Sequence, residues 1–392
     1  MIEIDLDLLQ SAALGAVMMI IGMLAVRRFA ILRKFCIPAA VVGGLLFSLF
    51  TLIMWEGGIA IFTIDDTLQK VCMNMFFCSV GFLASFSTLK SGGRVLGIMV
   101  VLVTVMIIMQ DIIGPTCASL FGMDPKFGLT LGSISLFGGH GTAAAYGDIL
   151  VEEYGMKGAD VVALASATFG LAIAGILGGP LARRLVVRNN LVSDGVDDRP
   201  ETKVKTMIDP KSFVLGMAAL IICIGVGSFF NDALEAIGFV LPSYFGALIV
   251  AVIFRNFCDA IKFRLPIVEI DTIGWVCLSL FLSMALMSIE LWQLHGLGAF
   301  MFLTLIIQTI VLCLFVYFVV FRATGKNYES AALSAGFMGF GMGATPNAVA
   351  NVEALTEAHG PAPMAFFLVP IVGGVFVDIV NAAVLTILLN TL

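Results

Sequence analysis

Long stretches without a charged residue recur along the whole chain. Eight of them have the length of a membrane span: Leu8–Val26, Phe35–Trp55, Val71–Leu89, Val161–Ala182, Ser212–Asn231, Ala236–Phe254, Thr272–Ile289 and Leu291–Phe321. Two further apolar runs, Val95–Cys117 and Pro361–Leu392, are each interrupted by a single aspartate. A membrane-spanning helix needs about 20 predominantly apolar residues. The pattern therefore predicts an all-α polytopic membrane protein with ten transmembrane helices.

Two other apolar segments contain residues that break helices. The first reads LFGGHGTAAAYG (136–147) and the second reads GFGMGATPNAVAN (339–351). At membrane depth, irregular backbone is tolerated only where protein buries it or where it lines a polar cavity. A matched pair of broken segments in two halves of a chain is typical of a transporter's substrate site. We expect a re-entrant hairpin at about 127–153 and another at about 328–359.

Composition excludes several other classes of protein. Hydrophobic residues make up 60% of the chain and charged residues 12%, far from the soluble averages of about 45–50% and about 25%. No basic patch with interleaved aromatic residues is present, which argues against a nucleic-acid partner. The acidic start, MIEIDLDLLQ, does not resemble a cleaved signal peptide. The eight cysteines lack the paired spacing of a disulfide framework or a transition-metal site.

The distribution of lysine and arginine predicts the orientation in the membrane. If both broken segments re-enter, 18 of the 21 basic residues fall on one face. If both cross the membrane, the same counting leaves 7 inside and 14 outside. Cytoplasmic loops carry the excess of basic residues. We therefore expect ten spans with two hairpins, both termini outside, and a cytoplasmic linker at 186–211.

This linker is the only long polar stretch and divides the chain into two halves. A first repeat at 1–185 and a second at 212–392 would each contain five spans. An odd number of spans gives the two halves opposite orientations, as in many secondary transporters. Gln110 in the fourth predicted span has a counterpart in Gln308 in the ninth. We expect two inverted repeats whose hairpin tips meet near the middle of the membrane.

The hairpin tips have glycines that suit ligand binding through the backbone. A tip ends one half-helix, with free carbonyls, and begins another, with free N–H groups. The N–H end attracts a carboxylate, and the carbonyls suit Na⁺. Gly139, Gly141, Gly341 and Gly343 are expected to allow a close backbone approach or a positive φ. Glycine-mediated helix packing is the alternative explanation.

Polar side chains follow these glycines. Thr142 offers a hydroxyl at the start of a half-helix. Thr345 is expected to cap the next half-helix, with Asn347 just inside it, because the proline between them suits a first turn. His140 could bind a substrate carboxylate or shuttle a proton. A neutral histidine held by hydrogen bonds is the alternative for His140.

Ionisable residues inside membrane segments are functional candidates by default. Asp378 lies deep in the last span with Asn381 on the same helix face, and the pair could hold Na⁺ or a substrate ammonium. Asp111 follows Gln110 in the fourth span; an aspartate satisfied by neighbouring hydroxyls is the alternative for both aspartates. Ser166 and Thr168 occupy the position of the first repeat that matches Asp378. The alternative for both residues is that the hydroxyl donates a hydrogen bond to a backbone carbonyl of its own helix.

Enzymatic activity has little support in the sequence. No nucleophile–base pair, zinc-ligand spacing or phosphate-binding loop is present. A channel or a membrane sensor remains the rival to a transporter. A channel needs a continuous pore with repeated selectivity ligands, whereas the two broken segments here differ from each other.

Four short motifs can be compared with known families: GGHGT at 138–142, ASATFG at 165–170, GMGATP at 341–346 and DIVN at 378–381. These motifs are similar to those of the bacterial sodium/glutamate symporters, and the resemblance covers about Pro38 to Asn390. It implies Na⁺-driven uptake of L-glutamate across the bacterial inner membrane, with Na⁺ as coupling ion and no cofactor. It also implies a homodimer and an elevator-type movement. A related amino acid or dicarboxylate, coupled to Na⁺ or H⁺, is the alternative.

The candidate site residues fall into two groups. The substrate-binding candidates are Gly139, His140, Gly141, Thr142, Gly343, Thr345, Asn347, Asp378 and Asn381. The sodium-binding candidates are Ser166, Thr168, Gly341, Asp378 and Asn381.

Overall fold

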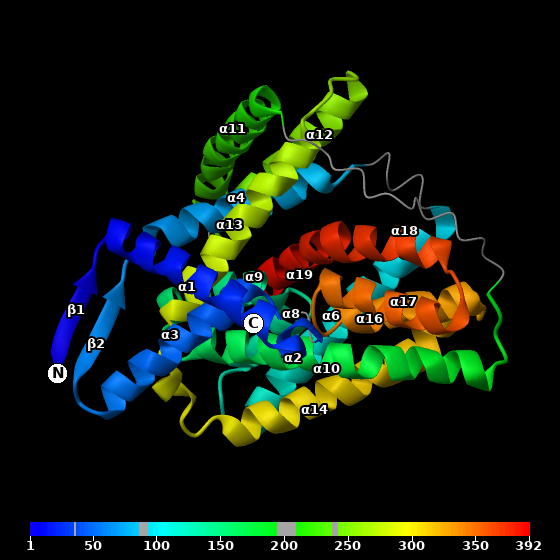
Figure 1. Ribbon diagram of the computed structural model, residues 1–392, viewed down its shortest axis with the longest axis horizontal. Coiled ribbons are helices and arrows are strands. Elements are labelled where there is room, and N and C mark those ends of the chain that lie inside the picture. The colour runs from blue at the N-terminus through cyan, green and yellow to red at the C-terminus, as the bar shows by residue number, and fades with distance from the viewer. Residues whose placement is uncertain (35–36, 86–92, 194–208, 237–241) are drawn as a thin grey trace. The chain divides into compact units, whose positions relative to one another are not determined.

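The computed structural model describes residues 1–34, 37–85, 93–193, 209–236 and 242–392 (Figure 1). Parts of three predicted spans and most of the predicted linker, 186–211, lie outside these residues. The chain divides into two compact units, and each unit takes segments from both halves of the sequence. Unit 1 comprises Met1–Ala84, His140–Leu164 and Ile208–Gly298, and unit 2 comprises Ser85–Gly139, Ala165–Met207 and Ala299–Leu392.

Unit 1 is built mainly from helices. Its elements are β1 (Ile2–Leu6), α1 (Leu8–Arg28), α2 (Ala30–Lys34), α3 (Ala39–Glu56), β2 (Ala60–Ile64), α4 (Thr67–Leu83), α11 (Pro210–Glu235), α12 (Tyr244–Ala260), α13 (Ile267–Met287) and the 3₁₀ turn Leu291–Leu294. The helix α9 (Gly139–Glu152) starts at the boundary and belongs to this unit from His140 onward. The helix α10 (Ala159–Arg188) begins in unit 1 and ends in unit 2.

Unit 2 contains the rest of the described helices. They are α6 (Gly93–Leu120), α7 (Pro125–Gly128), the 3₁₀ turn Leu129–Leu131, α8 (Ser133–Leu136), α14 (Gly298–Phe315), α15 (Phe321–Ala323), α16 (Tyr328–Phe340), α17 (Thr345–His359), α18 (Pro363–Ile371) and α19 (Val377–Thr391). Two π-helical turns, Val316–Val320 and Val372–Phe376, join α14 to α15 and α18 to α19.

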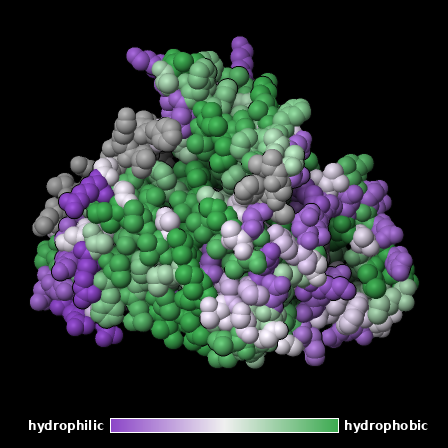
Figure 2. All heavy atoms as spheres, turned by 180° about the vertical axis from the view of Figure 1, so that it is seen from behind, coloured by the Kyte–Doolittle hydropathy of each residue, from purple (hydrophilic) through white to green (hydrophobic). Residues whose placement is uncertain are grey.

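Within the described residues, eight helical segments are long and apolar enough to cross a membrane: Leu8–Arg28, Ala39–Glu56, Gly93–Leu120, Ala159–Arg188, Pro210–Glu235, Ile267–Met287, Gly298–Ala323 and Pro363–Thr391. The other two predicted spans correspond to α4 and α12, which have 17 residues each. Large apolar side chains such as Leu24 on α1 and Phe229 on α11 are exposed, and apolar residues cover much of the face in Figure 2. The prediction of a mainly helical polytopic membrane protein is confirmed. Ten spans and inverted repeats stay predictions.

A two-stranded sheet in unit 1 was not expected from the hydrophobic pattern. The strands β1 and β2 pair in parallel, with Ile2 opposite Ala60 and Leu6 opposite Ile64. Each strand has only five residues; β1 precedes α1, and β2 precedes α4. The pairing joins segments more than 50 residues apart, so no local turn signal could have revealed it.

Glycines allow close helix crossings in unit 1. A Cβ at Gly22 of α1 would lie 1.9 Å from the Ala39 oxygen of α3. A Cβ at Gly246 of α12 would lie 2.1 Å from the Gly227 oxygen of α11. Small residues at such crossings let helix backbones approach closely, which is typical of packing inside membranes.

Candidate functional site

The second broken segment forms a helical hairpin in unit 2. Helices α16 and α17 are joined by a short turn at 341–344, and they occupy the residues expected for the second hairpin, 328–359. A Cβ at Gly339 would lie 2.2 Å from the Cα of Ala348, so only glycine permits this packing of the two helices. Neither helix reaches the length of about 20 residues that a span requires.

The N-terminus of α17 has no side-chain cap among the described residues. Ala344, with extended φ −157° and ψ 166°, is the N-cap residue. The expectation that Thr345 caps the helix is wrong, because Thr345 is already the first helical residue. A Cβ at Gly373 would lie 2.9 Å from Thr345 Oγ1. The first N–H groups of α17 are therefore left for a ligand, and Pro346 sits in the first turn as expected.

Two asparagines on one face of α17 attach it to α10. The Nδ2 of Asn347 donates to the oxygen of Leu171 at 2.7 Å, and the Nδ2 of Asn351 donates to the oxygen of Ala174 at 3.2 Å. Asn347 is 1% exposed. Its Oδ1 is buried, and none of the described residues donates to it. Asn347 thus offers one free oxygen beside the hairpin tip.

Two glutamines bind the two predicted hairpins in a crossed arrangement. Gln110 on α6 donates from Nε2 to the Gly341 oxygen at 2.9 Å. Gln308 on α14 donates from Nε2 to the Gln110 oxygen at 2.9 Å and to the Leu131 oxygen at 3.1 Å. Each glutamine therefore donates to the predicted hairpin of the other half of the chain. Both Oε1 atoms are buried and receive no hydrogen bond from the described residues.

Asp111 has a structural role at the start of α8. Its two carboxylate oxygens accept hydrogen bonds from the backbone N–H and the hydroxyl of Ser133, both at 2.7 Å. Asn381 on α19 donates from Nδ2 to the Ser133 oxygen at 3.1 Å. The Oδ1 of Asn381 is buried and has no donor within the described part of the chain. Asp111 follows the alternative expectation, a buried carboxylate satisfied by a neighbouring hydroxyl.

Asp378 lies in the first turn of α19, directly after the second π-helical turn. It is half-buried, and the described residues show no hydrogen bond or ion pair to its carboxylate. Pro370 precedes the π-helical turn inside α18 and cannot donate a backbone hydrogen bond, which favours an irregular helix here. Single π-helical turns are frequent at functional sites. Asp378 remains a candidate because its carboxylate has no hydrogen-bond or ion-pair partner among the described residues.

The positive φ expected at the tips occurs at one glycine. Gly139 has φ 58°, and a Cβ there would lie 3.2 Å from the Gly343 oxygen, so the two broken segments approach each other at this point. A Cβ at Gly343 would lie 2.8 Å from the Gly339 oxygen, and a Cβ at Gly341 would lie 2.8 Å from the Phe337 oxygen. Gly341 and Gly343 have no positive φ, and the close approach of these glycines to a ligand stays a prediction.

Gly141 does not fit the same expectation. Its φ is not positive, and a Cβ there would meet the side chains of Phe76, Phe77 and Leu278 at 3.5, 3.7 and 4.0 Å, which are ordinary contacts. His140 and Thr142 flank it in unit 1, where they are 5% and 2% exposed. These three residues belong to unit 1 and Gly139 belongs to unit 2.

The candidate sodium ligands of the first half lie on α10. Ser166 is fully buried and Thr168 is half-buried. One turn after Ser166, a Cβ at Gly170 would lie 2.2 Å from the Met342 oxygen. This part of α10 therefore packs against the tip of the second hairpin.

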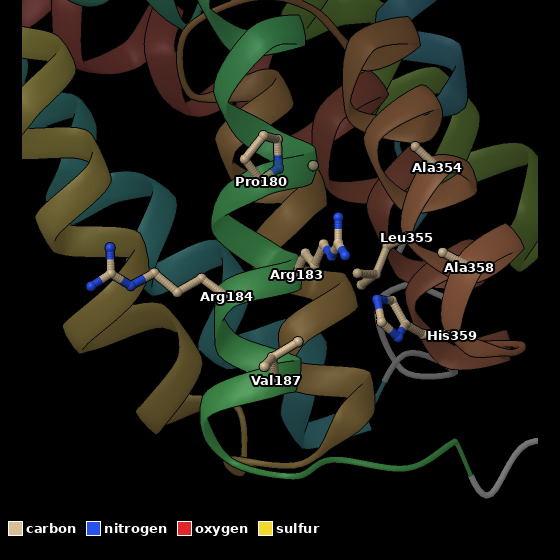
Figure 3. Close-up of a pocket in the computed structure, with 9 residues that line it drawn as sticks. Pro180, Arg183, Arg184, Val187, Ala354, Leu355, Ala358 and His359 are labelled. Carbon is tan, nitrogen blue, oxygen red and sulfur yellow. The ribbon is translucent and has the colours of Figure 1, made fainter.

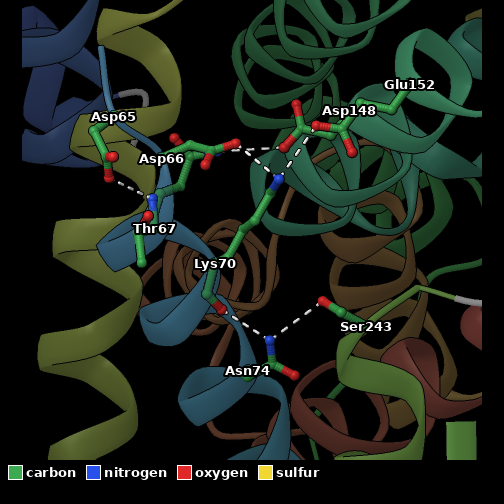
Figure 4. A network of polar contacts seen from close by, with 9 residues as sticks. Asp65, Asp66, Thr67, Lys70, Asn74, Asp148, Glu152 and Ser243 are labelled. Atoms are coloured by element: carbon green, nitrogen blue, oxygen red, sulfur yellow. Dashed lines mark hydrogen bonds and ion pairs between the residues drawn. The ribbon is translucent and has the colours of Figure 1, made fainter. Parts of the chain in front are cut away.

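A polar network in unit 1 attaches α9 to the start of α4 (Figure 4). The Nζ of Lys70 lies 2.9 Å from Asp66 and 3.2 Å from Glu152 of α9. The Nε2 of Gln69 donates to Asp148 of α9 at 3.3 Å. These contacts fix the last turn of the helix that begins with the glycine-rich GGHGT motif.

Gln110 thus contacts the tip of the second hairpin at Gly341, and Asn347 lies beside this tip. Four buried amide oxygens in unit 2 lack a donor from the described residues: Gln110 Oε1, Gln308 Oε1, Asn347 Oδ1 and Asn381 Oδ1. The sequence identified the two glutamines only as matching positions of the two repeats, and it did not identify Ser133 as the partner of Asp111. An isolated serine in an apolar run gives no signal of its partner, because its role depends on a helix 22 residues away.

Comparison with known proteins agrees with this arrangement. The chain matches the sequence profile of the sodium/glutamate symporters over residues 4–361. It is 40% identical over 397 residues to the sodium/glutamate symporters of Escherichia coli and Shigella flexneri, covering 98% of each chain. It is 38% identical over 388 residues to that of Haemophilus influenzae, covering 96% of each chain. The chain belongs to the sodium/glutamate symporter family, a family of transporters and not of enzymes.

Proposed function

We propose that this chain is a secondary transporter that couples the entry of Na⁺ to the uptake of L-glutamate. The observation that carries the proposal lies at the tip of the second hairpin. There, the buried Asn347 oxygen, which has no donor among the described residues, lies beside a helix N-terminus without a side-chain cap. The names of the relatives, which are about 40% identical along nearly the whole chain, support the same substrate and ion.

The free oxygens suit Na⁺ chemically. A buried acceptor without a donor costs about 1–3 kcal/mol, and a hard cation removes this cost by binding the oxygen. Asn347 and Asn381 supply neutral ligands, and Asp378 supplies the negative charge. Ser166, Thr168 and the Gly341 backbone are the further proposed ligands.

Glutamate requires a different set of partners. The free N–H groups at the start of α17, near Gly343 and Thr345, suit a substrate carboxylate. Asp378 suits the substrate ammonium. From the sequence pattern of the first broken segment, Gly139, His140, Gly141 and Thr142 are further proposed substrate ligands, the glycines through their backbone.

Alternating access by an elevator-type movement is part of the proposal. Each compact unit takes segments from both halves of the chain, and alternating access would move one repeat or bundle against another. The two broken segments would then be re-entrant hairpins. A homodimer is proposed from the family resemblance alone.

The proposed location is the bacterial inner membrane with both termini outside. The excess of lysine and arginine on one face supports this orientation. Single cysteines at Glu56 and Asn190, in a cysteine-free background, should react with membrane-impermeant reagents from opposite sides. Labelling of both from the same side would contradict the orientation.

Counterflow tests transport as such. Proteoliposomes loaded with unlabelled L-glutamate and diluted into labelled L-glutamate with equal Na⁺ on both sides should accumulate label transiently, because only a carrier exchanges substrate. Loading with L-aspartate or a dicarboxylate instead measures the substrate range. A channel would show no acceleration by internal substrate, and that outcome would overturn the proposal.

A further inference from the structure

A second polar pocket lies in unit 2, away from the hairpin tip. It has a volume of about 790 Å³ and lies between the last turns of α10 and α17. Its lining residues are Gly179, Pro180, Arg183, Arg184, Val187, Ala354, Leu355, Ala358 and His359. Arg183, Arg184 and His359 thus line the pocket together with apolar residues, and no acidic residue lines it.

Two contacts join the chain on either side of the lining residues in the sequence. Before them, a Cβ at Gly178 of α10 would lie 2.0 Å from the amide of Asn351 on α17, so the helices touch there. After them, the Ser193 hydroxyl donates to the Pro361 oxygen at 2.5 Å. The two segments that line the pocket are therefore in contact at both ends.

The polar groups of the pocket lack partners. Figure 3 shows Arg183 extending from α10 toward Leu355 and His359, whereas Arg184 points away from α17 in this view. Within the described residues, neither arginine forms an ion pair. The Nε2 of His359 is buried and has no hydrogen-bond partner in the same part of the chain. A buried ring nitrogen and a guanidinium that line one pocket without partners among the described residues are groups that an anion would satisfy.

We propose that this pocket binds the phosphate group of an anionic phospholipid. Arg183 supplies a planar guanidinium that matches two phosphate oxygens, and His359 can donate from Nε2 to a third. The apolar walls formed by Val187, Ala354 and Leu355 suit an acyl chain rather than water. The pocket lies at the basic end of α10, which has the length of a span, and basic pockets beside membrane-spanning helices are typical headgroup sites.

Binding of phosphatidylglycerol to purified protein in detergent tests the site. We expect one tightly bound lipid per chain, with about tenfold weaker binding in Arg183→Gln and in His359→Gln, because each loses a charge-assisted or buried hydrogen bond. Arg188→Gln is the matched control. It removes an equal charge from the same helix, but Arg188 bonds Tyr317 at 2.9 Å and does not line the pocket. The control should bind within about twofold of the unmodified protein.

Two further arms separate the sources of phosphate and the effects of folding. Inorganic phosphate at millimolar concentration should leave the lipid bound; if it displaces the lipid fully, the site serves a soluble phosphate and the lipid assignment is wrong. Thermal unfolding of each variant identifies any loss of folded protein. Arg183→Lys keeps the charge and should bind the lipid more tightly than Arg183→Gln but less tightly than the unmodified protein. Equal lipid binding in all folded variants would overturn the proposal.

Discussion

The Nε2 of Gln308 donates to the backbone oxygen of Gln110 at 2.9 Å, and the same nitrogen reaches the Leu131 oxygen at 3.1 Å. Gln110 in turn donates to the Gly341 oxygen. Two residues at corresponding places in the two halves of the chain therefore each donate to the predicted hairpin of the other half, 328–359 for Gln110 and 127–153 for Gln308. This crossed arrangement holds Gly341 and Leu131, both in unit 2, through neutral side chains whose Oε1 atoms have no donor among the described residues.

Loss of either glutamine should destabilise the tip. We expect Gln308→Leu and Gln110→Leu to lower the free energy of unfolding by about 1–3 kcal/mol each, because buried backbone oxygens lose their donors. The double variant should cost about the sum, because Gln308 donates to the backbone oxygen of Gln110, which Gln110→Leu keeps. Thermal unfolding of purified variants measures this, and unchanged stability in either single variant would contradict the role of these hydrogen bonds.

Gly139 and Gly141 form a matched pair in one motif. Gly139→Ala places a side chain at φ 58° and 3.2 Å from the Gly343 oxygen, which should cost about 1 kcal/mol or more in strain. Gly141→Ala meets only ordinary contacts at 3.5 Å or beyond. We expect at least about tenfold slower glutamate uptake in the first variant and near-normal uptake in the second. Similar rates in both, at equal membrane abundance, would refute the role of the close approach.

Asn347 and Asn351 separate ion binding from helix packing. Both attach α17 to α10 through Nδ2, but only Asn347 has a buried Oδ1 without a donor in the described chain. Asn347→Ala and Asn351→Ala should both lower thermal stability. Only Asn347→Ala should raise the Na⁺ concentration for half-maximal uptake, by about tenfold, which corresponds to about 1.4 kcal/mol. An equal Na⁺ response in both variants would remove Asn347 from the ion site.

Asp378 should govern the response to Na⁺. Asp378→Asn keeps the shape but removes the charge, so the Na⁺ concentration for half-maximal uptake should rise by about tenfold or more. Asp111→Asn is the matched control, because Asp111 is bonded to Ser133 by both oxygens. That control should unfold at a lower temperature, while its folded fraction keeps the normal Na⁺ curve. An unchanged Na⁺ curve in Asp378→Asn would make this residue structural.

The helices α16 and α17 begin and end close to the bounds expected for the second hairpin, and local signals mark both ends. Asn327 accepts the N–H of Ser330 at the start of α16, and Gly360, with φ 103°, ends α17. Such caps depend on a few neighbouring residues. The N-cap expected at Thr345 was wrong by one residue, because Ala344, with its extended backbone, is the N-cap residue of α17.

The features that the sequence did not predict depend on distant partners. The pairing of β1 with β2, the bond of Ser133 to Asp111 and the crossed glutamines all join segments far apart in the chain. The π-helical turn before Asp378 follows from Pro370 and from packing together. Hydrophobic periodicity identifies which residues enter the membrane but not which ones meet there.

The initial rate of labelled L-glutamate uptake into proteoliposomes, with Na⁺ and proton gradients imposed separately, tests the proposed coupling. Glutamate carries a net negative charge, and each Na⁺ that enters gains about 2.3 kcal/mol per 100 mV of inside-negative potential. An inward Na⁺ gradient without a proton gradient should therefore drive accumulation, and an inside-negative potential should accelerate it if more than one Na⁺ enters with each glutamate. Uptake driven by a proton gradient alone, with Na⁺ absent, would contradict Na⁺-coupled symport.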